Sequence, residues 1–262
     1  MMGSMHSFKA ASLSADRLDR AIDPDAANAA LGSLDPIGQL EWGLTTFEEC
    51  FALTTSFGIQ SAVLLHMASR VSASIPVIWV DTGYLTAETY RYAQQLCELL
   101  PIRLEVAQAE VGPARMEALH GRLWETGQLA DMERYLQLRK VQPLDQAFER
   151  LRVSCWASGV RSSQTDHRRT MQHLQDVRGR WSLRPLLAWT ARDVFYYMEE
   201  HSLPQHPLFA EGYSSVGDWH SSGPDGAGGD QSEGEEGNRS SRFGGLKQEC
   251  GIHLPGVMGE GI

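Results

Sequence analysis

Apolar residues along the middle of this chain follow two alternating patterns. Short segments with the apolar pattern of strands, either continuous or alternating, occupy residues 50–54, 76–80, 102–106 and 153–157, with a weaker fifth at 181–184. Longer stretches carry apolar residues at helical spacing; they are residues 16–31, 59–67, 87–100, 114–124, 144–151 and 190–201. Strands that alternate with helices predict an α/β fold, in which a mostly parallel twisted sheet has helices on both faces.

Three of the predicted strands end in residues suited to contact a ligand. Ser56, Asp81 and Gly159 follow the first, second and fourth strands. Ligands of open α/β sheets bind at the carboxyl ends of the strands. We therefore expect the functional site at this edge of the sheet.

The composition divides the chain into four parts. We expect a leader and a helix in residues 1–40, an α/β domain in 41–220, a flexible segment in 221–238 and a C-terminal tail in 239–262. The third part contains six glycines, and Ser, Asp and Glu make up most of the rest. Such a composition cannot bury enough apolar surface to fold on its own.

The formal net charge of −10 arises in one region. Residues 193–238 contain ten Asp and Glu and no Lys or Arg, whereas the remainder of the chain is balanced. The sequence therefore indicates no basic face of the kind that binds nucleic acid, although a few local cations are enough to bind a small anion.

Neither a membrane protein nor an exported protein is indicated. No window approaches the ~18 uninterrupted apolar residues that span a bilayer, and the first nine residues are not followed by the apolar run of a secretion signal. The four cysteines form no close pair, so they predict neither a disulfide framework nor a zinc site. We expect a cytoplasmic protein with free thiols and no bound metal.

The first predicted strand turns into a helix at Thr-Thr-Ser-Phe-Gly-Ile-Gln-Ser, residues 54–61. Gly58 allows backbone N–H groups to approach a ligand, and the amino end of a helix favours an anion. Ser56 and Ser61 add hydroxyl donors. No Gly-Lys-Ser/Thr follows, so this is not a Walker loop. The ordinary alternative is a turn with a capping serine, and both interpretations stay open.

Two further loops carry candidate binding residues. Asp81, Thr82 and Gly83 end the second strand, where the Asp either caps the next helix or contacts a ligand together with Thr82. Arg161 and Arg168 follow the fourth strand, where cations can bind phosphate or sulfate oxygens in a bidentate manner. The alternative for these arginines is a solvated loop. Arg139 and Lys140 are open to either an anion-binding role or an ordinary helix start before Pro143.

One cysteine differs from the other three. Those in apolar strand or helix positions, which predict core packing, are Cys50, Cys97 and Cys155. Cys250 has polar neighbours and follows the glycine-rich segment. A thiol near Lys247 and His253 can have a lowered pKa and react as the thiolate. The alternative is an incidental surface thiol.

Taken together, these residues resemble the phosphoadenylyl-sulfate reductases, from about residue 50 to residue 253. The matching motifs are Thr55-Ser56-Phe57-Gly58-Ile59-Gln60, Val80-Asp81-Thr82-Gly83-Tyr84, Glu88-Thr89-Tyr90, Arg139-Lys140-Val141-Gln142-Pro143-Leu144, Gly159-Val160-Arg161, His206-Pro207-Leu208, Glu211-Gly212-Tyr213, Val216-Gly217-Asp218 and Glu249-Cys250-Gly251-Ile252-His253. The order and spacing of the motifs carry the resemblance. It implies an adenine nucleotide alpha-hydrolase-like fold and the reduction of 3′-phosphoadenylyl sulfate to sulfite and adenosine 3′,5′-bisphosphate.

The resemblance also implies residue roles and partners. Cys250 is the implied nucleophile, which becomes an S-sulfocysteine on a tail that closes over the site, assisted by Arg242, Lys247 and His253. The implied substrate-binding residues are Ser56, Phe57, Gly58, Gln60, Ser61, Asp81, Thr82, Gly83, Lys140, Arg161, Gln164, Arg168, Asp218 and His220. The implied reductant is thioredoxin or glutaredoxin, the implied assembly is a homodimer, and the implied process is assimilatory sulfate reduction for cysteine biosynthesis.

A related subfamily, the adenylyl-sulfate reductases, holds an iron–sulfur cluster through two pairs of cysteines. This chain has Tyr135-Leu136 and Asp218-Trp219-His220-Ser221 at those places, and a cluster needs thiolate ligands. The resemblance therefore implies the cluster-free enzyme. Two family cations are missing: Ser162 replaces a second Arg, and Gly223 ends a motif that is usually His-Thr-Thr-Arg. The acidic segment 221–238 is also unlike the usual tail.

Three other functions stay open at this point. The first is activation of a carbonyl by adenylation with ATP, but Phe57 and Gln60 depart from the Ser-Gly-Gly-x-Asp-Ser loop of such enzymes. The second is a non-catalytic nucleotide-binding module, which would bind adenosine 3′,5′-bisphosphate without thiol-dependent turnover. The third is reduction of adenylyl sulfate without a cluster.

Overall fold

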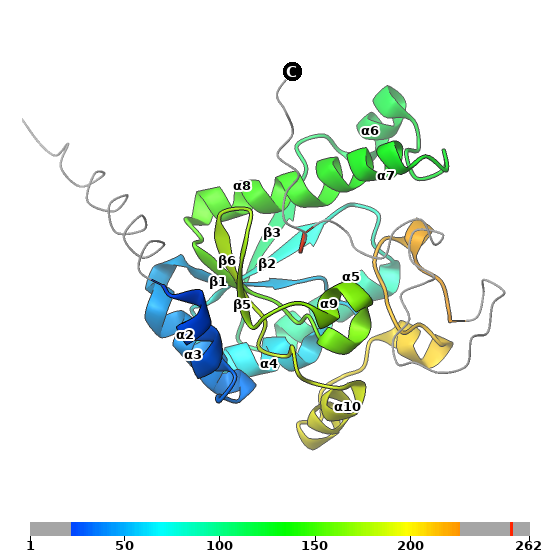
Figure 1. The fold of residues 1–262 in the computed structure, drawn as a ribbon. Helices are drawn as coiled ribbons and strands as arrows, with labels where there is room; N and C mark the ends of the chain where they lie inside the picture. Colours follow the sequence, from blue (N-terminus) through cyan, green and yellow to red (C-terminus); the bar gives the residue numbers. More distant parts are fainter. Residues whose placement is uncertain (1–21, 226–251, 254–262) are drawn as a thin grey trace, which may run out of the picture.

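The computed structural model describes residues 22–225 and 252–253, which are built around one six-stranded sheet (Figure 1). The strands are β1 (Phe51–Thr55), β2 (Pro76–Asp81), β3 (Arg103–Gln108), β4 (Cys155–Ala157), β5 (Leu174–Val177) and β6 (Arg180–Leu183). Their order is β3-β2-β1-β4-β6-β5, and all neighbours are parallel except β5 and β6. The predicted α/β fold with a mostly parallel sheet is confirmed.

The order of the strands reverses at β1. From β1 the chain adds β2 and β3 on one side of the sheet, and β4 and β6 on the other. The connections that leave the carboxyl ends of β1 and β4 therefore diverge to opposite sides. Such a switch point opens a crevice in which ligands of α/β proteins bind.

Helices surround the sheet (Figure 1), and shorter helical turns lie between the main elements. The α-helices are α2 (Pro24–Leu31), α3 (Pro36–Phe47), α4 (Ser61–Val71), α5 (Ala87–Leu99), α6 (Pro113–His120), α7 (Leu129–Leu136), α8 (Gln142–Leu151), α9 (Asp166–Arg169) and α10 (Ala191–Glu200). The short turns are η1 (Glu48–Cys50), η2 (Gln137–Val141), η3 (Ser162–Gln164), η4 (Pro207–Glu211) and η5 (Trp219–Ser221).

Alternate residues of the central strands enter two separate cores. Phe51 and Leu53 of β1 belong to a large cluster with residues of α2, α3, α4, α5 and α10. Ala52, which lies between them, packs in a second cluster with Leu144 and Phe148 of α8. Because both faces of β1 are covered, its sequence is a continuous apolar run, which is why the strand was predictable.

Several elements differ from their predictions. In the region where a helix was expected at residues 16–31, α2 begins at Pro24 after the N-cap Asp23, and residues 1–21 lie outside the described part. A further helix, α3, continues across the domain boundary predicted at residue 40. Two glycines in α3 weaken its helical signal. The helix predicted at residues 114–124 ends at His120, and α7 follows as an unpredicted helix.

A proline shapes the long helix that leads from α7 to α8. Pro143 has no N–H for the carbonyl of Arg139, and its ring would collide with that carbonyl in a regular α-helix. The preceding residues, η2, form a π-helical turn, in which both Arg139 and Lys140 are buried. The alternative of an ordinary helix start at these two residues is therefore wrong.

An antiparallel hairpin of β5 and β6 closes one edge of the sheet. Arg178 and Gly179 at its turn both have positive φ, 55° and 74°, as a type I′ turn requires. The predicted strand at 181–184 is β6, displaced by one residue, whereas β5 was not predicted. The side chain of Asn28 in α2 bonds both the N–H and the carbonyl of Leu174 in β5, at 2.9 and 2.8 Å. These bonds satisfy backbone groups at the sheet edge.

We predict that Gly43→Ala lowers the free energy of unfolding by about 1–3 kcal/mol. The added methyl group would lie 2.7 Å from the ring of Phe51 and 3.0 Å from Leu183, so α3 would have to move away from the sheet. Urea denaturation followed by circular dichroism measures the change. Gly223→Ala, which meets no atom within 4 Å, is the control and is expected to change stability by less than about 0.5 kcal/mol. Equal stability of both variants would contradict the close packing of α3.

Candidate functional site

A cavity of about 250 Å³ opens at the carboxyl ends of β1, β2 and β4, beside the switch point. The predicted site residues that line it are Ser56, Gly58, Gln60, Ser61, Thr82, Lys140, Arg161, Gln164, Arg168 and His253. The predicted site residues that do not line it are Phe57, Asp81, Gly83, Asp218 and His220. Cys250, Lys247 and Arg242 lie outside the described residues.

The loop between β1 and α4 presents backbone groups to the cavity. Ser61, the first residue of α4, donates its hydroxyl to the carbonyl of Gly58 at 2.7 Å, so it is not a capping serine. Gln60, at the N-cap position, forms no capping bond through its side chain. The first N–H groups of α4 thus have no side-chain cap among the described residues, and they favour an anion at this end of the helix.

Phe57 holds this loop in an unusual conformation. Its φ is 46°, which is rare for a bulky residue, and its side chain is completely buried. The ring packs edge-on against Trp79, with 5.0 Å between centroids, and the backbone N–H donates to the hydroxyl of Thr55. Phe57 therefore supports the turn from behind. Backbone strain that the packing maintains is common at binding sites.

Two buried arginines that follow β4 line the cavity, Arg161 in the loop and Arg168 in α9. Arg161 donates to the side-chain oxygen of Gln60, and Arg168 donates to that of Gln164. Gln164 also accepts from the N–H of Arg161 at 3.1 Å. The predicted alternative of a solvated loop is wrong for these two arginines, because less than a tenth of either is exposed. The amide side chains of Gln60 and Gln164 thus help to orient the two guanidinium groups.

Asp81 stabilises the end of β2. One carboxylate oxygen accepts from the N–H of Gly83 at 2.8 Å and from the hydroxyl of Tyr90 at 2.6 Å, and the other accepts from Gln108 at 2.7 Å. Helix α5 is capped by Thr86 instead. The carboxylate of Asp81 is thus occupied by nearby groups of the protein, whereas Thr82 and Leu85 of the same loop line the cavity.

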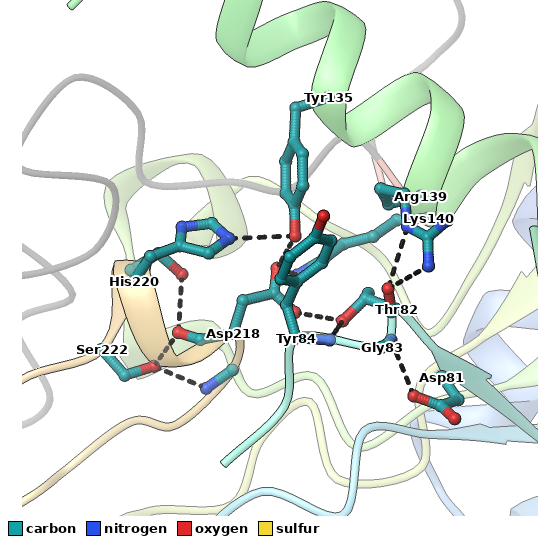
Figure 2. Close-up of polar contacts among 12 residues, drawn as sticks. Asp81, Thr82, Gly83, Tyr84, Tyr135, Arg139, Lys140, Asp218, His220 and Ser222 are labelled. Carbon is teal, nitrogen blue, oxygen red and sulfur yellow. Dashed lines mark hydrogen bonds and ion pairs between the residues drawn. The ribbon is translucent and has the colours of Figure 1, made fainter. Parts of the chain in front are cut away.

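Asp218 connects three distant elements behind the cavity (Figure 2). Its carboxylate lies 2.8 Å from the ammonium of Lys140 and accepts the hydroxyl of Thr82 at 2.5 Å and that of Tyr135 at 3.0 Å. The Nε2 atom of His220 lies 3.0 Å from the Tyr135 hydroxyl. The His220 ring stacks on Trp124, with 4.2 Å between the ring centroids. Asp218 is completely buried, so these partners replace its hydration.

The charge states in this network follow from its geometry. Burial alone would raise the pKa of Asp218, but the Lys140 ammonium and the Thr82 hydroxyl together hold that pKa well below its usual range. Burial, followed by the nearby Asp218 carboxylate, raises the pKa of Tyr135. Tyr135 therefore stays protonated and donates to Asp218, and its oxygen accepts a hydrogen bond from the Nε2–H group of His220. Lys140 reaches the cavity as a cation whose position is set by Asp218.

Tyr135 and Trp124 were not among the predicted site residues. Tyr135 lies in α7, which was not predicted, and the π turn places it and Lys140 around one carboxylate. Trp124 lies beyond the end of α6 in a connecting loop. The helical period of 3.6 residues does not apply across a π turn, so no sequence pattern relates these residues to Asp218.

The described residues Ile252 and His253 lie against the sheet at the same cavity. His253 stacks on Trp156 of β4, and Ile252 packs in the second core with residues of α8.

The predictions for the other cysteines hold in part. Cys155 is fully buried, whereas Cys50 and Cys97 are half-buried. Burial raises the pKa of the Cys97 thiol.

Two general features complete the description. Within residues 22–225 and 252–253, no three His, Cys, Asp or Glu side chains gather as a metal-binding group. In the same part of the chain, every helix is too short or too polar to cross a bilayer.

We predict that Asp218→Asn lowers the free energy of unfolding at pH 7 by about 3–5 kcal/mol, because Lys140 loses its buried carboxylate partner. The folded pKa of Asp218 is depressed, so its contribution is complete above the unfolded pKa of about 3.9 and is lost as the pH falls below that value. Urea denaturation from about pH 6 down to about pH 3 should therefore show the difference from wild type shrinking with acid.

The control for this prediction is Asp166→Asn. Its carboxylate forms a 3.0 Å ion pair with Arg169, but the Asp166 side chain is 92% exposed, and such pairs contribute about 0–1 kcal/mol. If Asp218→Asn cost no more than this control, the buried network would not stabilise the fold.

Comparison with known proteins places this site in a family. The family model of the phosphoadenosine phosphosulfate reductase domain matches residues 51–224. A Synechococcus protein named phosphoadenosine 5′-phosphosulfate reductase is 52% identical over 227 residues, covering 87% of this chain and 95% of that relative. A protein of the same name from Xanthomonas oryzae pv. oryzae is 43% identical over 251 residues, covering 95% and 99%.

Solved structures agree with this assignment. The crystal structure of phosphoadenylyl-sulfate reductase from Candida auris, a phosphate complex, has a TM-score of 0.68 and 27% identity, and covers 78% of this chain and 98% of that one. FMN adenylyltransferase from Candida glabrata shares the fold alone, with a TM-score of 0.52 and 12% identity over 81% of this chain and 72% of that one. The predicted adenine nucleotide alpha-hydrolase-like fold is confirmed, and the chain belongs to the phosphoadenosine phosphosulfate reductase family.

Proposed function

We propose that this protein reduces 3′-phosphoadenylyl sulfate to sulfite and adenosine 3′,5′-bisphosphate, in assimilatory sulfate reduction. The observation that carries the proposal is one cavity that is lined both by three cations, Lys140, Arg161 and Arg168, and by Ile252 and His253. These last two residues come shortly after Cys250 in the sequence. The anion-binding groups and the chain beside the thiol therefore meet at one place.

The proposed donor is a polyanion, and the cavity is suited to it. The amino end of α4, whose N-cap residue Gln60 makes no side-chain cap bond within the described residues, and the hydroxyl of Ser56 offer hydrogen-bond donors on one side. Lys140, Arg161 and Arg168 offer cations on the other. Charge-assisted hydrogen bonds to phosphate and sulfate oxygens are among the stronger polar contacts in proteins. These groups hold the donor and stabilise the phosphate that departs as the reaction proceeds.

The proposed reaction has two steps. The Cys250 thiolate attacks the sulfur of the sulfuryl group, a bond from Sγ to that sulfur forms, and the bond from sulfur to the phosphate oxygen breaks with its electron pair on adenosine 3′,5′-bisphosphate. The product is an S-sulfocysteine. An external dithiol then attacks Sγ of Cys250, sulfite leaves with the electron pair, and the second thiol of the donor restores the Cys250 thiolate.

The reductant in this proposal is thioredoxin or glutaredoxin. The other three cysteines belong to secondary-structure elements, where Cys155 is buried and Cys50 and Cys97 are half-buried, so an outside dithiol is the simpler source of the two electrons. We further propose a cytoplasmic homodimer in which residues 239–262 form the catalytic tail and residues 221–238 connect it to the domain. Arg242, Lys247 and His253 assist the thiol.

The proposed reaction uses no iron–sulfur cluster. Where cluster-containing relatives carry one pair of cysteines, this chain has Tyr135 and Leu136, and the Tyr135 hydroxyl is bonded to Asp218. At the second place stand Asp218 and His220, which belong to the same network. The polar atoms of Tyr135, Asp218 and His220 bond one another. None of these residues supplies the thiolate ligands that an iron–sulfur cluster requires.

We predict that Cys250→Ser binds adenosine 3′,5′-bisphosphate with an affinity within about twofold of wild type but forms no sulfite, because a hydroxyl at this position lacks the nucleophilicity of a thiolate. Calorimetry measures the affinity, and a thioredoxin-coupled assay measures sulfite. Cys97→Ser is the matched control and should keep its activity. Sulfite release by Cys250→Ser at the wild-type rate would overturn the mechanism.

The same assay identifies the donor when it is run with 3′-phosphoadenylyl sulfate and with adenylyl sulfate. We predict a higher kcat/KM for the 3′-phosphorylated donor, because additional phosphate oxygens meet the cations of the cavity. Preference for adenylyl sulfate would favour the cluster-free adenylyl-sulfate reductase. Nucleotide binding without any sulfite would favour a binding module.

A further inference from the structure

The two described residues that follow Cys250 in the sequence contact the domain in three ways. The ring of His253 stacks on Trp156 of β4, with 5.2 Å between centroids and 23° between planes. The side chain of Ile252 packs against the second core. The carbonyl oxygen of Ile252 accepts a hydrogen bond of 2.9 Å from Nη1 of Arg178, in the turn of the β5–β6 hairpin.

Arg178 is itself held in place. Its Nη2 atom forms an ion pair of 3.0 Å with Asp145 of α8, and only 16% of the Arg178 side chain is exposed. One planar guanidinium group therefore links α8 and the backbone of Ile252 at once, which a lysine ammonium at the same place would do with less directional control. Because the pair is mostly shielded from water, salt screens it less than a surface pair.

We propose that Arg178 is a positioning residue for the sulfuryl transfer, because it anchors the backbone of Ile252 beside the cavity. The proposal rests on the proposed function, in which Cys250 is the nucleophile. Two residues span at most about 7 Å, so in this proposal an anchored Ile252 limits how far Cys250 can move away from it. Confinement of a nucleophile near its target raises its effective concentration and so the rate of bond formation.

In this role, Arg178 affects the rate of sulfuryl transfer but not the affinity for the nucleotide. Arg178 is not among the residues that line the cavity, so its loss removes none of the cations or hydroxyl groups that are proposed to hold the nucleotide. It would instead lower the fraction of time that Ile252 is docked. A hydrogen bond from a charged group typically changes such an equilibrium by about ten- to a hundredfold.

We predict that Arg178→Met slows the addition of SO3 to Cys250 at least about tenfold, while the affinity for adenosine 3′,5′-bisphosphate stays within about twofold of wild type. Mass spectrometry measures the rate of SO3 addition after the full chain is mixed with 3′-phosphoadenylyl sulfate and no reductant. Calorimetry measures the affinity for adenosine 3′,5′-bisphosphate. kcat should fall with little change in KM. Arg178→Lys, which keeps the charge near Asp145, should recover part of the rate.

Arg180→Met is the matched control from the same hairpin. The guanidinium of Arg180 donates to the carbonyl of Val153 at 3.2 Å and lies over the ring of Phe148, so its loss removes a contact of the hairpin with the domain. The control should transfer the sulfuryl group at a rate within about twofold of wild type. Asp145→Asn leaves Arg178 in place but weakens its orientation, and it should lower the rate by a smaller factor than Arg178→Met. Transfer at the wild-type rate in both Arg178→Met and Asp145→Asn would overturn the proposal.

A second measurement distinguishes this inference from the proposed function. Hydrogen exchange at Ile252 and His253 in the full chain, without any donor, should be faster in Arg178→Met than in wild type and Arg180→Met. If wild type acquires no SO3 although exchange depends on Arg178, the proposed function fails together with the kinetic role of Arg178. If wild type is modified and neither exchange nor rate responds to Arg178, only the inference fails.

Discussion

The contact between Asp218 and Lys140 is the interaction on which the rest of the site depends. A completely buried carboxylate is stable only if charged and polar partners replace its water, and here Lys140, Thr82 and Tyr135 do so from different elements. The residues just before Asp218, at 214–217, form one wall of the cavity. The same ion pair therefore fixes that wall against the sheet and sets the position of Lys140, which lines the cavity.

Neighbouring cations in the chain have quite different roles. The π turn caused by Pro143 buries both Arg139 and Lys140. Arg139 donates to the backbone carbonyls of Thr82 and Val111, so it holds the loop after β2 to the long helix. Lys140 turns to Asp218 and the cavity. Two adjacent cations of one helix therefore differ in role, because Arg139 holds the backbone of a loop whereas Lys140 lines the cavity.

The proposed reaction divides its machinery between a preformed cavity and the end of the chain. The groups that bind anions come from the loops at the switch point of the sheet, where rigid elements hold them. The nucleophile is carried near the C-terminus, which allows the same thiol to meet first a bound donor and then an outside dithiol. Such a division needs a means of placing the chain end correctly, and the contacts of Ile252 and His253 offer one.

The sequence by itself determined the buried strands, because a strand covered on both faces must be apolar throughout, and it determined the family through the order of its motifs. It could not determine α3, with its two glycines, or β5, whose Gln175 and Asp176 carry no strand signal. Nor could it separate Asp81, which stabilises its own loop, from Asp218, which holds Lys140. Only the tertiary structure decided these, because partners far apart along the chain are chosen by packing and by the cost of burying a charge without a counter-charge.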